Sequence, residues 1–193
     1  LTPAAKGMGG AIEKAHTLAQ EIDNALLLQQ FNNADNPAMH RTTTAIEILK
    51  DTKEHIDIFI AAVGTGGTIT GTAEVLREKI ASVHIVAVEP AASAVLGGEP
   101  AGPHKIQGIG AGFTPDILNT QIYNEVVAVC DNEAFRMAAR IAKKEGLLIG
   151  ISSGANLEAA YRLAQRPENR GKVIVTILCD TAERYLSTEL FDH

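Results

Sequence analysis

The stretch Asp57-Ile-Phe-Ile-Ala-Ala-Val-Gly-Thr-Gly-Gly-Thr-Ile-Thr-Gly71 decides the fold and points to a ligand. Its apolar first half predicts a buried strand, which a glycine-threonine loop joins to a helix. Glycines let backbone N–H groups approach an anion at the positive end of such a helix, and threonine hydroxyls add further donors. We therefore predict a phosphate-binding loop made of Gly64, Thr65, Gly66, Gly67 and Thr68.

The details of this loop limit the kinds of phosphate ligand. A Walker loop closes with a Lys-Ser/Thr pair, and none is present here, which argues against a nucleoside triphosphate. A dinucleotide fingerprint needs a third glycine where this chain has Ile69, although Glu89 ends the next predicted strand where a ribose-binding acid would lie. A glycine-rich turn without a ligand is the remaining alternative.

Predicted strands and helices alternate along the chain. The strand runs are apolar on both faces, as in a parallel sheet that helices cover on each side. The fold class is therefore predicted to be α/β. The run 91–113 is rich in glycine and proline, and a connection of that length is usually functional. Strands are predicted at 25–31, 57–63, 83–90, 125–130 and 173–178, and helices at 2–22, 38–50, 68–80, 132–145 and 153–164.

The composition favours a small-molecule ligand. Hydrophobic residues make up 46% of the 193 residues, charged residues 21%, and the net charge is −6. With no Trp and no basic-aromatic patch, we expect neither nucleic acid nor membrane as a partner, and a cytoplasmic location. The histidines lack metal-site spacing, so no metal site is expected. Cys130 and Cys179 each close an apolar run and are predicted to lie near buried strand ends.

Five segments of the chain form a recognisable set: Leu28-Gln-Gln-Phe31, Gly64-Thr-Gly-Gly-Thr68, Gly102-Pro-His-Lys-Ile-Gln-Gly-Ile-Gly-Ala-Gly-Phe113, Gly150-Ile-Ser-Ser-Gly-Ala-Asn156 and Glu183-Arg-Tyr-Leu-Ser-Thr188. In this order they closely resemble cysteine synthase, the O-acetylserine sulfhydrylase family of fold type II pyridoxal phosphate enzymes. The resemblance spans essentially the whole chain and implies the tryptophan synthase β-like fold, with pyridoxal 5'-phosphate as cofactor. It also implies β-replacement of O-acetylserine by sulfide, giving cysteine and acetate.

The resemblance assigns roles to individual residues. The loop from Gly64 to Thr68 would bind the cofactor's phosphate, and Thr181 would hydrogen-bond its pyridine nitrogen. Gln30 would help to hold the carboxylate of the amino-acid substrate, and Gly108 lies in the glycine loop that would flank that substrate. Family members are homodimers, and they can bind the C-terminal tail of serine acetyltransferase in the active-site cleft.

Two departures from the family pattern qualify these expectations. The segment with the family's Schiff-base lysine and the Ser-Thr-Asn substrate loop match nothing here, so we interpret the chain as a C-terminal portion that does not turn over alone. Residues 1–33 would then be a remnant of the smaller domain and 34–193 the larger domain. The lysines present, Lys6 among them, are expected to be solvated charges. Cys179-Asp-Thr-Ala182 replaces Pro-Ser-Ser-Gly or Pro-Asp-Ser-Gly but keeps a hydroxyl at Thr181.

Two other functional classes stay open at this stage. Gly150-Ile-Ser-Ser-Gly154 also fits the G-x-S-x-G pattern of a serine hydrolase, with Ser152 as nucleophile and Asp180 and His193 following in hydrolase order. Alternatively, the chain is a non-catalytic fragment that binds only phosphate or a partner. In the preferred reading, Ser152 instead lies at the start of a helix whose N-terminus faces the site.

Overall fold

A four-stranded parallel sheet lies at the centre of the computed structural model, which describes residues 1–191. The strands stand side by side in the order β3-β2-β1-β4, and every neighbouring pair is parallel. This arrangement confirms the predicted α/β fold class. The strands are β1 (Ile58–Ala62), β2 (His84–Pro90), β3 (Glu125–Val129) and β4 (Ile174–Thr176).

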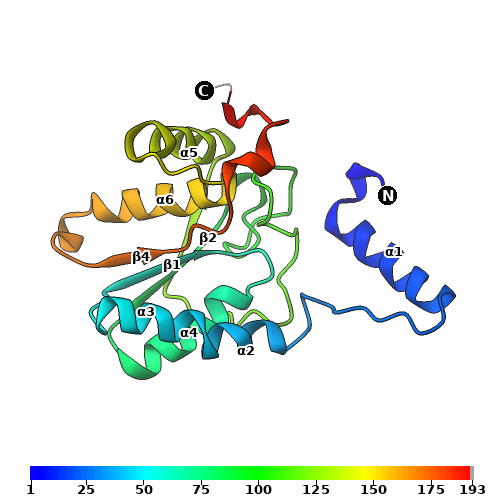
Figure 1. Ribbon diagram of the computed structural model, residues 1–193, viewed down its shortest axis with the longest axis horizontal. Coiled ribbons are helices and arrows are strands. Elements are labelled where there is room, and N and C mark those ends of the chain that lie inside the picture. The colour runs from blue at the N-terminus through cyan, green and yellow to red at the C-terminus, as the bar shows by residue number, and fades with distance from the viewer. Residues whose placement is uncertain (192–193) are drawn as a thin grey trace.

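Helices cover both faces of the sheet, and α1 stands apart from them (Figure 1). On one face lie α5 and α6, and on the other lie α2, α3 and α4. A short 3-10 turn, Ala4–Lys6, precedes α1. The helices are α1 (Gly7–Glu21), α2 (Asp35–Thr42), α3 (Thr44–Thr52), α4 (Gly67–Lys79), α5 (Asp131–Glu145) and α6 (Ile151–Ala164).

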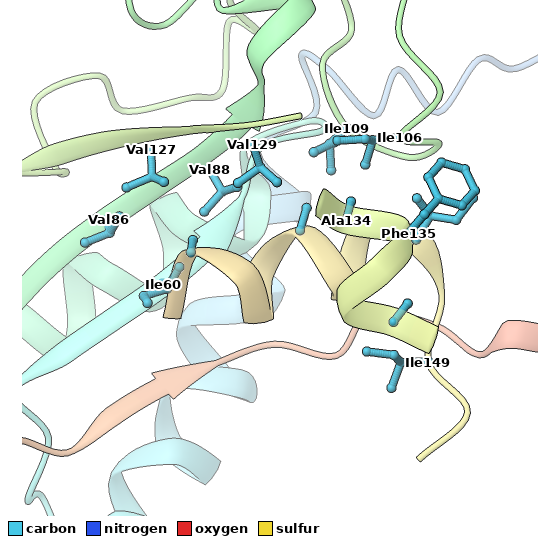
Figure 2. Packing of buried hydrophobic residues seen from close by; sticks show 14 of the residues in the cluster. Ile60, Val86, Val88, Ile106, Ile109, Val127, Val129, Ala134, Phe135 and Ile149 are labelled. Atoms are coloured by element: carbon cyan, nitrogen blue, oxygen red, sulfur yellow. The ribbon is translucent and has the colours of Figure 1, made fainter. Parts of the chain in front are cut away.

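Alternate residues of β1 pack into two separate hydrophobic cores. Ile58 and Ile60 pack with α5 and α6 in the core that Figure 2 shows from close by. Phe59 and Ala61 pack with α3 and α4 on the other face. Each fully buried Ile or Phe side chain contributes about 1.5–3 kcal/mol. Both faces of the strand are therefore buried, which explains its continuous apolar run.

The single helix predicted at 38–50 is wrong in its extent, because two helices occupy this region. The chain breaks at Thr43, whose φ of −121° and ψ of −78° lie outside the helical range. The Thr43 hydroxyl donates to the backbone oxygen of Met39 at 2.7 Å. A run of three β-branched threonines with side-chain bonds to the preceding turn disfavours a continuous helix. The first helix already begins at Asp35, three residues before the predicted start at residue 38.

The strand predicted at 25–31 is also wrong. Its backbone pairs with no other strand in the part of the chain that the structure describes. Leu26 and Leu28 are 81% and 73% exposed. An apolar run becomes a strand only where a neighbouring strand pairs with it, so composition alone was an insufficient guide here.

The two cysteines depart from their predicted burial. Cys130 follows β3 and Cys179 follows β4, as expected, but both are exposed. Since β4 ends at Thr176, Cys179 lies beyond the sheet. The run 91–113 is irregular apart from a 3-10 turn at Ala91–Ser93, as predicted.

Candidate functional site

The loop after β1 lies at the carboxyl edge of the sheet, where ligands of open α/β sheets bind. Gly66 is the N-cap of α4 and has a φ of +83°, a left-handed conformation that glycine adopts readily. The N-cap residue itself makes no side-chain cap, although Thr65 Oγ1 accepts from the Gly67 N–H at 3.3 Å, and the first turn contains no acidic residue. The remaining backbone N–H groups of this turn and the positive end of the helix dipole are therefore available to an anion.

The two threonines of the loop have different surroundings. Thr65 lines a cavity, whereas Thr68 Oγ1 lies 3.2 Å from Nε2 of His40 on α2. The other ring nitrogen of His40 lies 2.9 Å from Thr44 Oγ1. Burial lowers the pKa of His40, which favours the neutral ring with one donor and one acceptor nitrogen. His40 therefore connects Thr68 to α3 without adding a charge beside the loop.

Sequence reasoning missed His40 because its contact with Thr68 joins positions 28 residues apart. Only the packing of α2 against α4 indicates a role for His40. Gly71 on α4 allows this close packing, since a Cβ atom there would lie 2.9 Å from His40 Cβ. Local patterns on α2 do not report such an approach.

A cavity of about 940 Å³ opens beside the loop and contains four of the predicted site residues, Gln30, Gly64, Thr65 and Gly108. Gly64 packs directly against the glycine loop, because a Cβ atom on Gly64 would lie 2.3 Å from the Gly108 oxygen. The lining residues are Ala5, Lys6, Gly7, Met8, Gly9, Gln30, Phe31, Gly64, Thr65, Ala101, Gly102, Pro103, His104, Ile106, Gln107, Gly108, Ile109, Gly110, Ala111, Gly112 and Phe113.

Backbone and ring contacts hold the glycine loop of this cavity in place. The Gly110 N–H donates to the Val63 oxygen at 3.0 Å, and the Gly110 oxygen lies 2.9 Å from His104 Nε2. The rings of Phe31 and Phe113 meet edge to face with 5.1 Å between centroids. The segment around Gln30 and the glycine loop therefore form one wall.

Lys6 is a cation at this cavity, where the sequence predicted only a solvated charge. Its side chain is 61% exposed, as expected for a solvated lysine, and its Nζ lies 3.8 Å from a Glu13 oxygen. A surface ion pair of this geometry contributes at most about 1 kcal/mol. Lys6 is therefore free to reorient toward an anionic ligand.

Thr181 does not line the cavity as the described residues define it. Its side chain is exposed, and its hydroxyl bonds the Glu183 carboxylate and lowers the pKa of that group. Ser152 is buried at 4% exposure, and a Cβ atom on Gly108 would lie 4.0 Å from Ser152 Oγ. Of these two hydroxyls, Ser152 is the one that the fold places beside the glycine loop.

The geometry does not support a serine hydrolase. Ser152 is the second residue of α6 and follows an isolated bridge at Ile149 instead of a strand of the sheet. The Asp180 carboxylate accepts a hydrogen bond from the Tyr185 hydroxyl. His193, the third predicted member of the triad, lies outside the described residues.

Neither a metal cluster nor a membrane-spanning helix is present in the described part of the chain. Within residues 1–191, histidine, cysteine and acidic side chains form no cluster of three or more that could hold a metal ion. Every helix in the same range is too short or too polar to cross a bilayer.

An α/β sheet with an uncapped helix N-terminus beside a glycine-lined cavity is typical of proteins that bind a phosphorylated small molecule. The model of one such family, described as pyridoxal-phosphate dependent enzyme, matches residues 2–180. The chain belongs to this family.

Three relatives are similar to this chain over nearly its whole length. Cysteine synthase B of Campylobacter jejuni is 51% identical over 99% of this chain and 63% of its own length. The crystal structure of a cysteine synthase from Entamoeba histolytica has a TM-score of 0.94 and 46% identity, over 100% of this chain and 57% of that one. An O-acetylserine dependent cystathionine β-synthase from Helicobacter pylori has a TM-score of 0.92 and 41% identity, over 98% and 61%. This chain thus spans less than two thirds of each relative.

The residues at the α4 N-terminus fit the family's cofactor. The phosphate of pyridoxal phosphate is a dianion, which the uncapped N–H groups at Gly66 and the helix dipole can bind. The Thr65 hydroxyl lines the adjoining cavity, whose volume exceeds that of a small cofactor.

Proposed function

We propose that this chain is part of a cysteine synthase, which replaces the acetoxy group of O-acetylserine with sulfide to give cysteine and acetate. The observation that carries the proposal is the uncapped N-terminus of α4 beside a cavity lined by Gln30, Thr65 and Gly108. The names of the Campylobacter and Entamoeba relatives support the choice of reaction.

In this proposal different residues of the chain bind the cofactor and the amino-acid substrate. Gly64, Thr65, Gly66, Gly67 and Thr68 hold the phosphate of the cofactor through backbone N–H groups and hydroxyls. Pyridoxal phosphate, when bound, supplies an electron sink for bonds made and broken at the amino-acid substrate. Gln30 donates to the substrate carboxylate, and Gly108 leaves room for the substrate at the cavity wall.

The partner of the pyridine nitrogen is proposed to be a neutral hydroxyl, and two residues compete for the role. Thr181 is the residue that the family resemblance assigns, and Ser152 is favoured by its position near Gly108. Thr181→Val and Ser152→Ala separate them, because loss of the true partner shifts the absorption of the bound cofactor and loss of the other hydroxyl leaves it unchanged.

The remaining features of the proposal rest on the family resemblance. Residues 1–33 belong to a smaller domain and 34–193 to the larger one, in keeping with the separate position of α1 (Figure 1). The enzyme is proposed to be a cytoplasmic homodimer that can bind the C-terminal tail of serine acetyltransferase. Sedimentation with and without a peptide of that tail tests both assemblies.

The experiment that tests the proposal is the intact mass of the native polypeptide before and after borohydride reduction with pyridoxal phosphate. One reduced cofactor adduct, together with cysteine formation from O-acetylserine and sulfide, supports it. No adduct on the native polypeptide contradicts it. The 193-residue chain alone is the control and is expected to give no adduct and no turnover, since none of its lysines matches the family's Schiff-base position.

Assays of product formation with alternative substrates identify the donor and the acceptor. O-phosphoserine is compared with O-acetylserine as donor. Homocysteine is compared with sulfide as acceptor, since the Helicobacter relative is named a cystathionine β-synthase. A preference for sulfide with O-acetylserine is the expected result.

A further inference from the structure

Asn36, in the first turn of α2, contacts two segments of the proposed site with one side-chain amide. Its Nδ2 donates to the backbone oxygen of Gln30 at 2.9 Å and to Thr65 Oγ1 at 3.0 Å. A side-chain amide has two N–H groups, so both donors are used. Gln30 and Thr65 each line the cavity. Asn36 does not line it and connects the two residues through these hydrogen bonds.

The hydrogen bonds to Thr65 determine what its hydroxyl can do. Its oxygen accepts from Asn36 Nδ2 and, at 3.3 Å, from the Gly67 N–H. A hydroxyl has two acceptor lone pairs and one O–H donor, so both lone pairs are filled. The hydroxyl can therefore meet a ligand only as a donor, which suits a phosphate oxygen.

Close packing holds the Asn36 side chain in this position. A Cβ atom on Gly67 would lie 1.9 Å from Asn36 Oδ1, so only glycine at this position of α4 leaves room for the amide. One turn later, a Cβ atom on Gly71 would lie 2.1 Å from the Pro37 oxygen. The first turn of α2 thus lies directly against α4, and the amide has little freedom to reorient.

We propose that Asn36 is a positioning residue that fixes the Thr65 hydroxyl as a phosphate donor and ties the Gln30 segment to the phosphate loop. The inference rests on the proposed function, because it assumes that the anion bound at α4 is the cofactor's phosphate. Asn36 touches neither cofactor nor substrate. It acts through Thr65 on the phosphate and through the Gln30 backbone on the amino-acid carboxylate.

The first test is Asn36→Asp in the full chain. A carboxylate at this position has no donors, so it would accept the Thr65 O–H and direct it away from the ligand. It would also add a negative charge beside the anion. We expect the dissociation constants of inorganic phosphate and of pyridoxal phosphate, measured by calorimetry, to rise by about 100-fold. The ³¹P resonance of the bound cofactor should also shift.

The matched control is Asn33→Asp, which makes the same charge change just before α2. The Asn33 amide donates to the Leu28 oxygen and accepts from the Asp35 N–H, and neither bond involves Thr65. Phosphate affinity should stay within about threefold of the unsubstituted chain, since the bonds of Asn33 join it to Leu28 and Asp35 instead of the phosphate loop, and water and salt screen a half-exposed charge. An equal loss in both variants would overturn the proposal.

A double-mutant cycle guards against a purely structural effect. If Asn36 acts through Thr65, Asn36→Ala should weaken phosphate binding about tenfold in the unsubstituted chain and much less in a Thr65→Val background. Additive losses would overturn the positioning role even if both variants fold. A chain that binds neither phosphate nor pyridoxal phosphate before any substitution would instead contradict the proposed function itself.

Discussion

Helices α4 and α5 both begin at the carboxyl edge of the same sheet, yet their N-termini are satisfied in different ways. α5 has Asp131 and Glu133 in its first turn, and the Glu133 carboxylate accepts from the Cys130 N–H at 2.8 Å. α4 begins at a glycine cap without acidic residues in its first turn. One helix therefore neutralises its positive end internally, whereas the other leaves it for a ligand.

The acid at α5 is held in its charged form. Although burial opposes ionisation, the Cys130 N–H and the Arg162 guanidinium lower the pKa of Glu133. At α4 the corresponding partners are the hydroxyls of Thr65 and Thr68, which carry no charge. The comparison shows that the type of residue in the first turn separates a structural helix end from a binding one.

The largest expected effect tests the glycine cap of α4. Gly66→Ala should destabilise the chain by about 3 kcal/mol or more, because a left-handed conformation costs about 1–2 kcal/mol and overpacking adds about 1–3 kcal/mol. The new Cβ atom would lie 2.8 Å from Leu118 Cβ. Urea denaturation measures the difference.

The glycine that ends α5 provides the control for this substitution. Gly146 has a φ of +71°, and a Cβ atom there would meet no described atom within 4 Å. Gly146→Ala should therefore cost only about 1–2 kcal/mol for the left-handed conformation, without the overpacking. Equal losses for the two variants would mean that packing around Gly66 is not what requires glycine.

The substitution with the second-largest expected effect gives α4 an acidic first turn like that of α5. Thr68→Glu places a carboxylate in the first turn of α4, where it would repel an anionic ligand and occupy the free N–H groups. Phosphate affinity should fall by about 100-fold, which equals about 2.7 kcal/mol. Thr68→Gln is the neutral control and should lose about tenfold. Calorimetry that finds equal affinity for the glutamate and glutamine variants would refute the electrostatic explanation.

The smallest effect removes the charge at α5. Glu133→Gln should lower stability at pH 7 by about 1 kcal/mol, the usual contribution of a helix cap. The pKa of Glu133 is lowered by folding, so its contribution is present above the ordinary pKa of 4.5 and is lost as pH falls through the folded value. The stability difference between the two proteins should therefore close below pH 4.5. A constant difference down to pH 2.5 in thermal melts would show that charge is not involved.

How much of this could be predicted from sequence depends on how local each feature is. The loop Gly64–Thr68 was predictable because strand, turn and helix start lie within one short stretch. His40 and Asn36 were missed because they reach that loop only through the packing of α2 on α4. The strand predicted at 25–31 failed for a related reason, since pairing depends on a neighbour that local composition does not reveal.

The break at Thr43 and the exposure of Cys130 show limits of another kind. Apolar spacing predicted one helix through Thr43, but hydroxyl bonds to the preceding turn outweigh that periodicity. Cys130 follows a buried strand, yet it already belongs to the surface-exposed start of α5. At such junctions the period of the pattern changes within one or two residues, which a window of residues averages away.

The pairing of β1 with β4 has a consequence for how the chain reaches this structure. The Val173 N–H donates to the Asp57 carboxylate, and the Thr176 hydroxyl donates to the Ile60 oxygen, each across 116 positions. During synthesis, β1 and β2 can pair long before β4 has left the ribosome. The edge of β1 that pairs with β4 therefore stays unpaired until the last strand has been synthesised. Contacts of such sequence separation form slowly. The nascent chain should depend most on chaperones during that interval.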